Sequence, residues 1–332
     1  MMTAYLGNRR WQHLALDLLR RSMVLLVLIA LAYYFDAKTG RFLQERNLRN
    51  VAQQNAHILI VTVGMTLVML SGGIDLSVGS IAALAGAVSA GLIVNEGLGF
   101  WPAVGVTLGV GFGLGLVNGG LVVWGRLPPF VATLSMMGVA RGLTLLYTEN
   151  KPISIAKVED YTFWRRGSFD LPLLGETPAP VVVALVVVLL AMWMLSRTRY
   201  GLHVYAVGGG EETARLAGVP VDRVKLLTYA LSGALAALAG ILLTARVYSA
   251  QPRNGVGLEL EAIAAAVLGG VSLFGGVGSV LGAAIGALLI GVLANGMNLM
   301  RVESYQQEMI KGVVLAVAVM VDMYTKRFER RE

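Results

Sequence analysis

The feature that most constrains this chain is a succession of apolar runs, several of them near the roughly 20 residues that a helix needs to cross a bilayer. Hydrophobic residues make up 56% of the chain and charged residues 14%, whereas soluble domains average roughly 45–50% and 25%. The pattern predicts an all-α integral membrane protein with about ten transmembrane helices (about eight to eleven), some of them broken or re-entrant.

Glycine, proline and polar residues separate the expected spans. The spans are expected at residues 22–35, 51–70, 76–94, 101–124, 129–147, 180–195, 226–246, 260–273, 279–299 and 309–323. The first run is short enough to be a cleaved signal peptide instead of a span. The run at 260–273 is also short and ends at Gly275-Gly276, so it is either a partial helix or a re-entrant one.

Basic residues gather at both ends of the chain and in the loops, which accounts for the net charge of +7 without nucleic acid as a partner. We expect a basic cytoplasmic segment at 1–21, a single transmembrane domain at 22–324 and a basic cytoplasmic tail at 325–332. Ten spans place both ends on the same side of the membrane, and eight spans would do the same. The basic ends favour the cytoplasmic side.

The most polar short segment between two long apolar runs reads GGGEETARLAGVP (208–220), within a loop at 197–225. Its three leading glycines permit a sharp entry into a short helix. Glu211 and Glu212 suit the positive end of that helix, and Arg215 suits its negative end. Gly218 is placed as a left-handed stop.

A helix of about two turns is not stable alone in water, so its own membrane domain or a partner must hold it. It is either a helical surface loop or an element that transmits motion to a soluble partner. Ala214 is small enough to let the helix lie close in a groove of such a partner. The candidate coupling residues are Gly208, Gly209, Glu211, Glu212, Ala214, Arg215, Leu216 and Gly218.

The chain lacks the elements of common catalytic and cofactor sites. No Gly-Lys pair occurs, so there is no Walker-type phosphate loop. Cysteine is absent and the three histidines are far apart in sequence, so a metal site is not expected. We therefore expect no catalytic residue and no cofactor bound by this chain.

Asp75 is the sharpest candidate for a functional residue inside the membrane, because a charge at mid-bilayer costs roughly 2.5–3.5 kcal/mol on insertion scales. It either caps the third span near the interface or makes a polar contact in a translocation pathway. The other pathway candidates are Asn118, Gln251, Glu259, Asn295 and Asn298. The three asparagines either hydrogen-bond a polyol or tie helices together. Glu259 either faces a water-filled mouth or caps the eighth segment.

One short pattern occurs twice. The letters GGIDL and then VGS (72–80) return as GGVSL and then VGS (269–279). Transporters are often built from repeats with broken helices at matching positions. In a chain with 41 glycines, chance similarity is the alternative reading.

Five stretches resemble, in order and at consistent spacing, the membrane permease of ribose-type sugar importers of the ATP-binding cassette (ABC) class. They are GMTLVMLSGGIDLSVGSIAAL (64–84), PPFVATLSMMGVARGLTLLYT (128–148), YAVGGGEETARLAGV (205–219), SAQPRNGVGLELEAIAAAVLGGVSLFGG (249–276) and NGMNLM (295–300). The resemblance implies a type II-importer-like permease in the bacterial inner membrane that moves a monosaccharide, such as a ribose-like pentose, inward.

The resemblance also implies partners: a second permease copy or a related subunit, ABC ATP-binding subunits that carry ATP and Mg²⁺, and a periplasmic sugar-binding protein. It implies that Gly208 to Gly218 couples the permease to its ATPase. The family usually has Asn where this chain has Gly210, so a contact made by that side chain is not expected here. A permease for nucleosides or branched-chain amino acids is the competing reading, and the few acids in the spans disfavour a proton-coupled secondary transporter.

Overall fold

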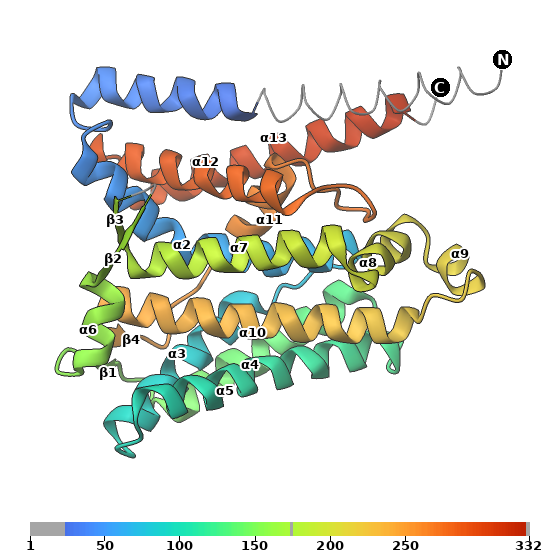
Figure 1. Cartoon of the computed structure of the whole chain (residues 1–332), viewed down its shortest axis with the longest axis horizontal. Coiled ribbons are helices and arrows are strands. Elements are labelled where there is room, and N and C mark those ends of the chain that lie inside the picture. Colours follow the sequence, from blue (N-terminus) through green and yellow to red (C-terminus); the bar gives the residue numbers. More distant parts are fainter. Residues whose placement is uncertain (1–23, 173–174, 330–332) are drawn as a thin grey trace.

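The computed structural model describes residues 24–172 and 175–329, and Figure 1 shows them as a bundle of long helices that run side by side. The bundle is formed by α2 (Glu45–Leu70), α3 (Val78–Val94), α4 (Phe100–Val123), α5 (Pro129–Tyr147), α7 (Ala179–Arg197), α10 (Val221–Val247), α11 (Leu258–Leu268), α12 (Val280–Leu299) and α13 (Ser304–Glu329). Residues 24–39 are also helical. Within the described residues, six helices are long and apolar enough to cross a membrane, namely α2, α4, α5, α7, α10 and α12. The expected all-α membrane architecture is confirmed.

Short elements lie at the two ends of the bundle (Figure 1). At one end are α8 (Arg199–Gly209) and α9 (Glu211–Leu216). At the other are β1 (Ile153–Ser154), α6 (Glu159–Arg166), β2 (Ser168–Leu171), β3 (Gly175–Pro178) and β4 (Ser249–Ala250). Strand β1 pairs antiparallel with β4, and β2 pairs antiparallel with β3. The polar connection at 148–178, between the fifth and sixth expected spans, is therefore partly structured.

Several boundaries differ from the sequence prediction. The third span begins at residue 78 rather than 76, the eighth ends at 268 rather than 273, and the tenth begins at 304 rather than 309. Proline lies at two other starts: Pro129 is the first residue of α5, as expected, and Pro180 is the second residue of α7, which begins at 179 rather than 180. The expected basic segment at 1–21 and the last three residues of the tail expected at 325–332 lie outside the described residues, whereas 325–329 belong to α13.

A helix also occupies part of the loop expected at 197–225. Thr198 begins it, because the Thr198 Oγ1 accepts a hydrogen bond of 3.2 Å from the backbone nitrogen of Gly201 and caps α8. Gly208 and Gly209 are the last residues of α8 rather than part of a sharp entry into α9. Only Gly210 separates the two helices, so the expectation of a three-glycine turn is wrong.

Helix α10 packs against α4, α2 and α3. Glycines of α4 permit its close approach to α10. A Cβ added at Gly111 would lie 2.5 Å from the Gly233 carbonyl oxygen, and one at Gly119 would lie 2.9 Å from the Leu226 Cα. Any side chain there would push α4 away from α10. The pairing is antiparallel, so the loop at 124–128 lies at the same end of the bundle as α9.

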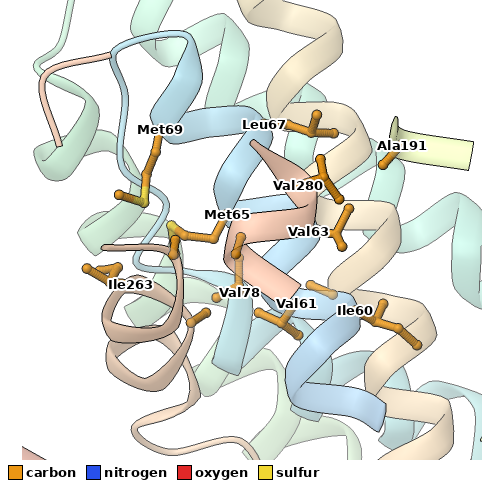
Figure 2. Close-up of a cluster of buried hydrophobic side chains, with 14 of the residues drawn as sticks. Ile60, Val61, Val63, Met65, Leu67, Met69, Val78, Ala191, Ile263 and Val280 are labelled. Atoms are coloured by element: carbon orange, nitrogen blue, oxygen red, sulfur yellow. The ribbon is translucent and has the colours of Figure 1, made fainter. Parts of the chain in front are cut away.

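The main core surrounds the second half of α2. Figure 2 shows side chains of α2 lying among Ala191 of α7, Ile263 of α11 and Val280 of α12. Met65, at the centre of this stretch, is fully buried. Because lipid tails are as apolar as these side chains, close packing between helices, rather than removal from water, stabilises this contact.

Candidate functional site

The α8–α9 element stands at one end of the bundle (Figure 1). Gly218 ends α9 with a φ of 82°, the left-handed value expected from the sequence. The nitrogens of Val219 and Gly218 donate to the carbonyl oxygens of Ala214 and Arg215 at 3.0 Å each. These two bonds form a Schellman stop, which satisfies carbonyls that would otherwise lack partners at the helix end.

The side chain that α9 presents outward is not the expected one. The Ala214 side chain is 4% exposed and packs into the main core of its own chain. Leu216, two residues further, is 83% exposed. Ala214 therefore does not face a groove of a partner, and this expectation is corrected: the apolar side chain that α9 presents outward is Leu216.

The charged residues of α9 are largely paired within the chain. Glu211 forms ion pairs with Lys225 at 2.5 Å and with Arg215 at 3.5 Å, and Arg215 also pairs with Asp222 at 2.8 Å. The hydrogen bond with Asp222 raises the pKa of Arg215 above its ordinary value. These pairs fasten α9 to the start of α10, while Glu212 is exposed. Glu211 and Arg215 are thus engaged before any partner arrives.

A second cluster of polar side chains lies at the break between α2 and α3. Asp75 is fully buried, and its Oδ1 accepts hydrogen bonds from the Ser77 nitrogen at 3.0 Å and the Ser77 Oγ at 2.5 Å. Its Oδ2 accepts a bond of 2.8 Å from Ser232 Oγ on α10. Asn118 Nδ2 on α4 donates to Ser77 Oγ at 2.8 Å. The residue at the N-cap of α3 is Ser77, and no side chain caps that helix, so the expectation that Asp75 caps the third span is corrected. The carboxyl group instead holds the turn before α3 and binds α10, and Ser77 adds the contact with α4.

A third group surrounds the loop that precedes α11. Arg141, within α5, donates from Nη1 to the carbonyl oxygens of Pro252 and Asn254 at 2.7 and 3.0 Å. Glu259 and Gly255 lie against Gly79 of α3, so closely that no Cβ fits at that position. This loop, 251–257, is held between α3 and α5, and its Gln251 is exposed.

The remaining two candidates form separate contacts. Asn295 Oδ1 accepts a bond of 2.9 Å from Asn47 Nδ2, and Asn298 Oδ1 accepts one of 2.9 Å from Gln307 Nε2. Both asparagines tie helices together. The six pathway candidates are therefore spread over separate places rather than forming one constellation. Among the described residues, no group of three or more His, Cys, Asp or Glu could hold a metal ion.

Sequence reasoning missed the partners of these candidates. Ser232 belongs to no motif, and Arg141 is a single cation within the expected fifth span. An arginine in the middle of an apolar run is itself a signal, since such a residue almost always pairs with another charge or with backbone carbonyls. That rule would have identified Arg141 as an anchor, although not which carbonyls it binds.

Comparisons with known proteins show which proteins this chain resembles. Residues 47–320 match the family described as branched-chain amino acid transport system / permease component. The chain is 44% identical over 97% of its length to the ribose import permease protein RbsC of Escherichia coli (strain K12), covering 99% of that protein. It is 44% identical over 85% of its length to RbsC of Bacillus subtilis (strain 168), covering 86% of it. It is 35% identical over 92% of its length to the xylose transport system permease protein XylH of Escherichia coli (strain K12), covering 92% of it.

Proposed function

This chain belongs to the family described as branched-chain amino acid transport system / permease component, and on that premise we propose that it is the membrane-spanning subunit of an ATP-driven importer for a monosaccharide. The observation that carries the proposal is the 44% identity to a ribose import permease over 97% of this chain. A second relative is named for xylose transport. Ribose and xylose are both five-carbon sugars, so a pentose or a related sugar is the favoured solute over an amino acid or a nucleoside.

The energy for transport is assigned to a separate subunit. The chain has no phosphate-binding loop of the Walker type, so ATP and Mg²⁺ belong on a partner ATPase. The α8–α9 element is the proposed contact with that partner. It stands at the end of the bundle, and its exposed Leu216 offers an apolar anchor for a pocket on the ATPase.

The remaining partners are a sugar-binding protein outside the inner membrane and a second permease subunit. Most residues of helices α4, α5 and α7 are not fully buried in one chain, which leaves their outer faces for lipid and for that second subunit. We place the α9 end in the cytoplasm, because the ATPase subunits that α9 is proposed to contact lie there. Basic residues at that end include Arg126, Arg197, Arg199, Arg215, Arg223 and Lys225, and they suit the cytoplasmic side.

Reporter fusions test the orientation. A fusion at Gly210, beside α9, should report the cytoplasm, and a fusion at Trp164 in α6 should report the periplasm, because these elements lie at opposite ends of the bundle. A periplasmic signal at Gly210 would contradict the proposed contact with the ATPase.

Transport by the assembled complex tests the function. The chain would be purified with its ATPase and reconstituted in liposomes, with the binding protein added on the outside. Uptake of labelled ribose and xylose would be compared with that of leucine and adenosine, with and without ATP inside the vesicles. ATP-dependent accumulation of a pentose alone is expected. Accumulation of leucine or adenosine in preference to any sugar would overturn the proposal.

A further inference from the structure

The end of α8 touches two helix breaks through backbone atoms alone. Gly208 lies against Leu70, the last residue of α2, and against Gly276 in the break between α11 and α12. A Cβ added at Gly208 would lie 2.5 Å from the Gly276 nitrogen and closer still to the Leu70 carbonyl oxygen. One added at Gly275 would lie 2.7 Å from the Gly208 oxygen and 2.9 Å from the Gly72 Cα. Because glycine has no side chain, the backbones of the three segments are in direct contact.

The two breaks are also joined to each other. The Gly276 nitrogen donates a hydrogen bond of 3.0 Å to the Leu70 carbonyl oxygen. Gly275 and Gly276 have φ values of 89° and 71°, which side-chain-bearing residues rarely adopt. One turn before the end of α8, the Tyr205 hydroxyl donates to the Gly278 carbonyl oxygen at 2.9 Å. Helix α8 thus contacts the second break at two points.

These breaks are the segments in which the sequence pattern GG…L…VGS occurs twice, at 72–80 and 269–279. Asp75 lies in the first break, five residues after Leu70, and it is hydrogen-bonded to Ser232 of α10. Helix α10 begins five residues after the end of α9. The α8–α9–α10 stretch therefore acts on the first break from both ends: Gly208 contacts Leu70, and Ser232 binds Asp75.

We propose that Gly208 is the positioning residue through which a displacement of α8–α9 reaches both helix breaks at once. The inference rests on the proposed function, because it takes α9 as the contact with the ATPase. Backbones in direct contact transmit displacement without the rotamer freedom that intervening side chains would have, and packed interiors shift between discrete arrangements rather than deforming gradually. Moving α8 therefore displaces the entry to α3 and the connection between α11 and α12 together.

The neighbouring glycine supplies a matched control. Gly209 is also in the last turn of α8, but no atom lies within 4 Å of a Cβ added there. Gly208→Ala and Gly209→Ala make the same chemical change and raise intrinsic helix propensity equally. Only the first inserts a methyl group between the three segments.

The experiment measures pentose transported per ATP hydrolysed in the reconstituted complex, beside ATPase pull-down and basal ATP hydrolysis. Gly209→Ala is the reference, because it adds the same methyl group to the same turn of the coupling element without a close contact. In complexes that retain the ATPase subunit, Gly208→Ala should lower the transport ratio about fivefold or more below that of Gly209→Ala, as expected for overpacking at a tight contact. A ratio for Gly208→Ala equal to that of Gly209→Ala, with the complex assembled, would overturn the proposal.

If the Gly208→Ala complex fails to assemble, a milder variant tests the proposal. Tyr205→Phe removes the hydrogen bond to Gly278 without adding volume, so the fold should persist while the transport ratio falls by at least about twofold. An unchanged ratio for Tyr205→Phe would then overturn the proposal. A wild-type complex that carries another solute would contradict the proposed function only, since the same ratio can be measured with that solute.

Discussion

The Oδ2 of Asp75 accepts a hydrogen bond of 2.8 Å from the Oγ of Ser232, 157 residues further along the chain. The other oxygen of the same carboxyl group accepts two bonds from Ser77. One fully buried side chain thereby fixes the entry to α3 against the middle of α10. Unpaired polar groups are costly in a dry interior, so each of these donors depends on Asp75.

Asp75→Asn should be tolerated far better than Asp75→Ala. The amide keeps an acceptor for the Ser77 nitrogen and a polar group for Ser232, whereas alanine leaves buried donors unsatisfied at about 1–3 kcal/mol each. The measurement is thermal unfolding in detergent beside uptake in vesicles. If Asp75→Asn abolished uptake while stability and ATPase docking stayed normal, Asp75 would instead act directly on the solute.

Arg141 should prove necessary for the position of loop 251–257. Arg141→Met removes the donor to the Pro252 and Asn254 carbonyl oxygens, each worth about 1–3 kcal/mol if left buried without a partner. Arg253→Met is the control, because that arginine is exposed in the same loop. We expect a lower unfolding temperature and lower uptake for Arg141→Met alone. Equal behaviour of the two variants would show that the loop does not depend on this clamp.

The β2–β3 hairpin, at the end of the bundle opposite α9, should detach more readily from α2 at acidic pH. A hydrogen bond from Arg49 at 3.0 Å, with a second one from Ser168, lowers the pKa of Glu176 below its ordinary value. A depressed pKa means that the contact stabilises the fold above the ordinary pKa of glutamate and that this stabilisation is lost as the pH falls through the lowered value. Proteolysis of the β2–β3 hairpin should therefore accelerate in acid, and Glu176→Gln should remove that pH dependence. An unchanged acid response in Glu176→Gln would contradict this.

Much of the bundle could be predicted from the sequence because its causes are local. Apolar runs located the long helices, Pro129 and Pro180 lie at two helix starts, and Gly218 marked the end of α9. The contacts between distant segments could not be predicted in this way. Nothing near Ser232 indicates Asp75 as its partner. Every residue has a backbone carbonyl group, so the sequence does not show which ones Arg141 binds.

The orientation of α9 was not predictable for a different reason. A six-residue helix is too short for its apolar residues to define a face. Ala214 looked suited to a groove because it is small, but the same small size suits the packing of α9 against its own chain. The phase of the helix is set by the Schellman stop at Gly218 and by the ion pairs to the start of α10, and these appear only in three dimensions.

Leu216 should therefore matter more than Ala214 for binding the ATPase. Leu216→Asp keeps the fold, because the side chain is 83% exposed, but it places a charge where an apolar anchor is expected and should lower ATPase recovery in a pull-down by about tenfold or more. Ala214→Trp should instead destabilise the permease itself by about 1–3 kcal/mol, because that side chain packs inward. Glu212→Ala is the control: it removes an exposed charge, and exposed ion pairs contribute only about 0–1 kcal/mol. Normal ATPase recovery with Leu216→Asp would show that α9 meets its partner through another face.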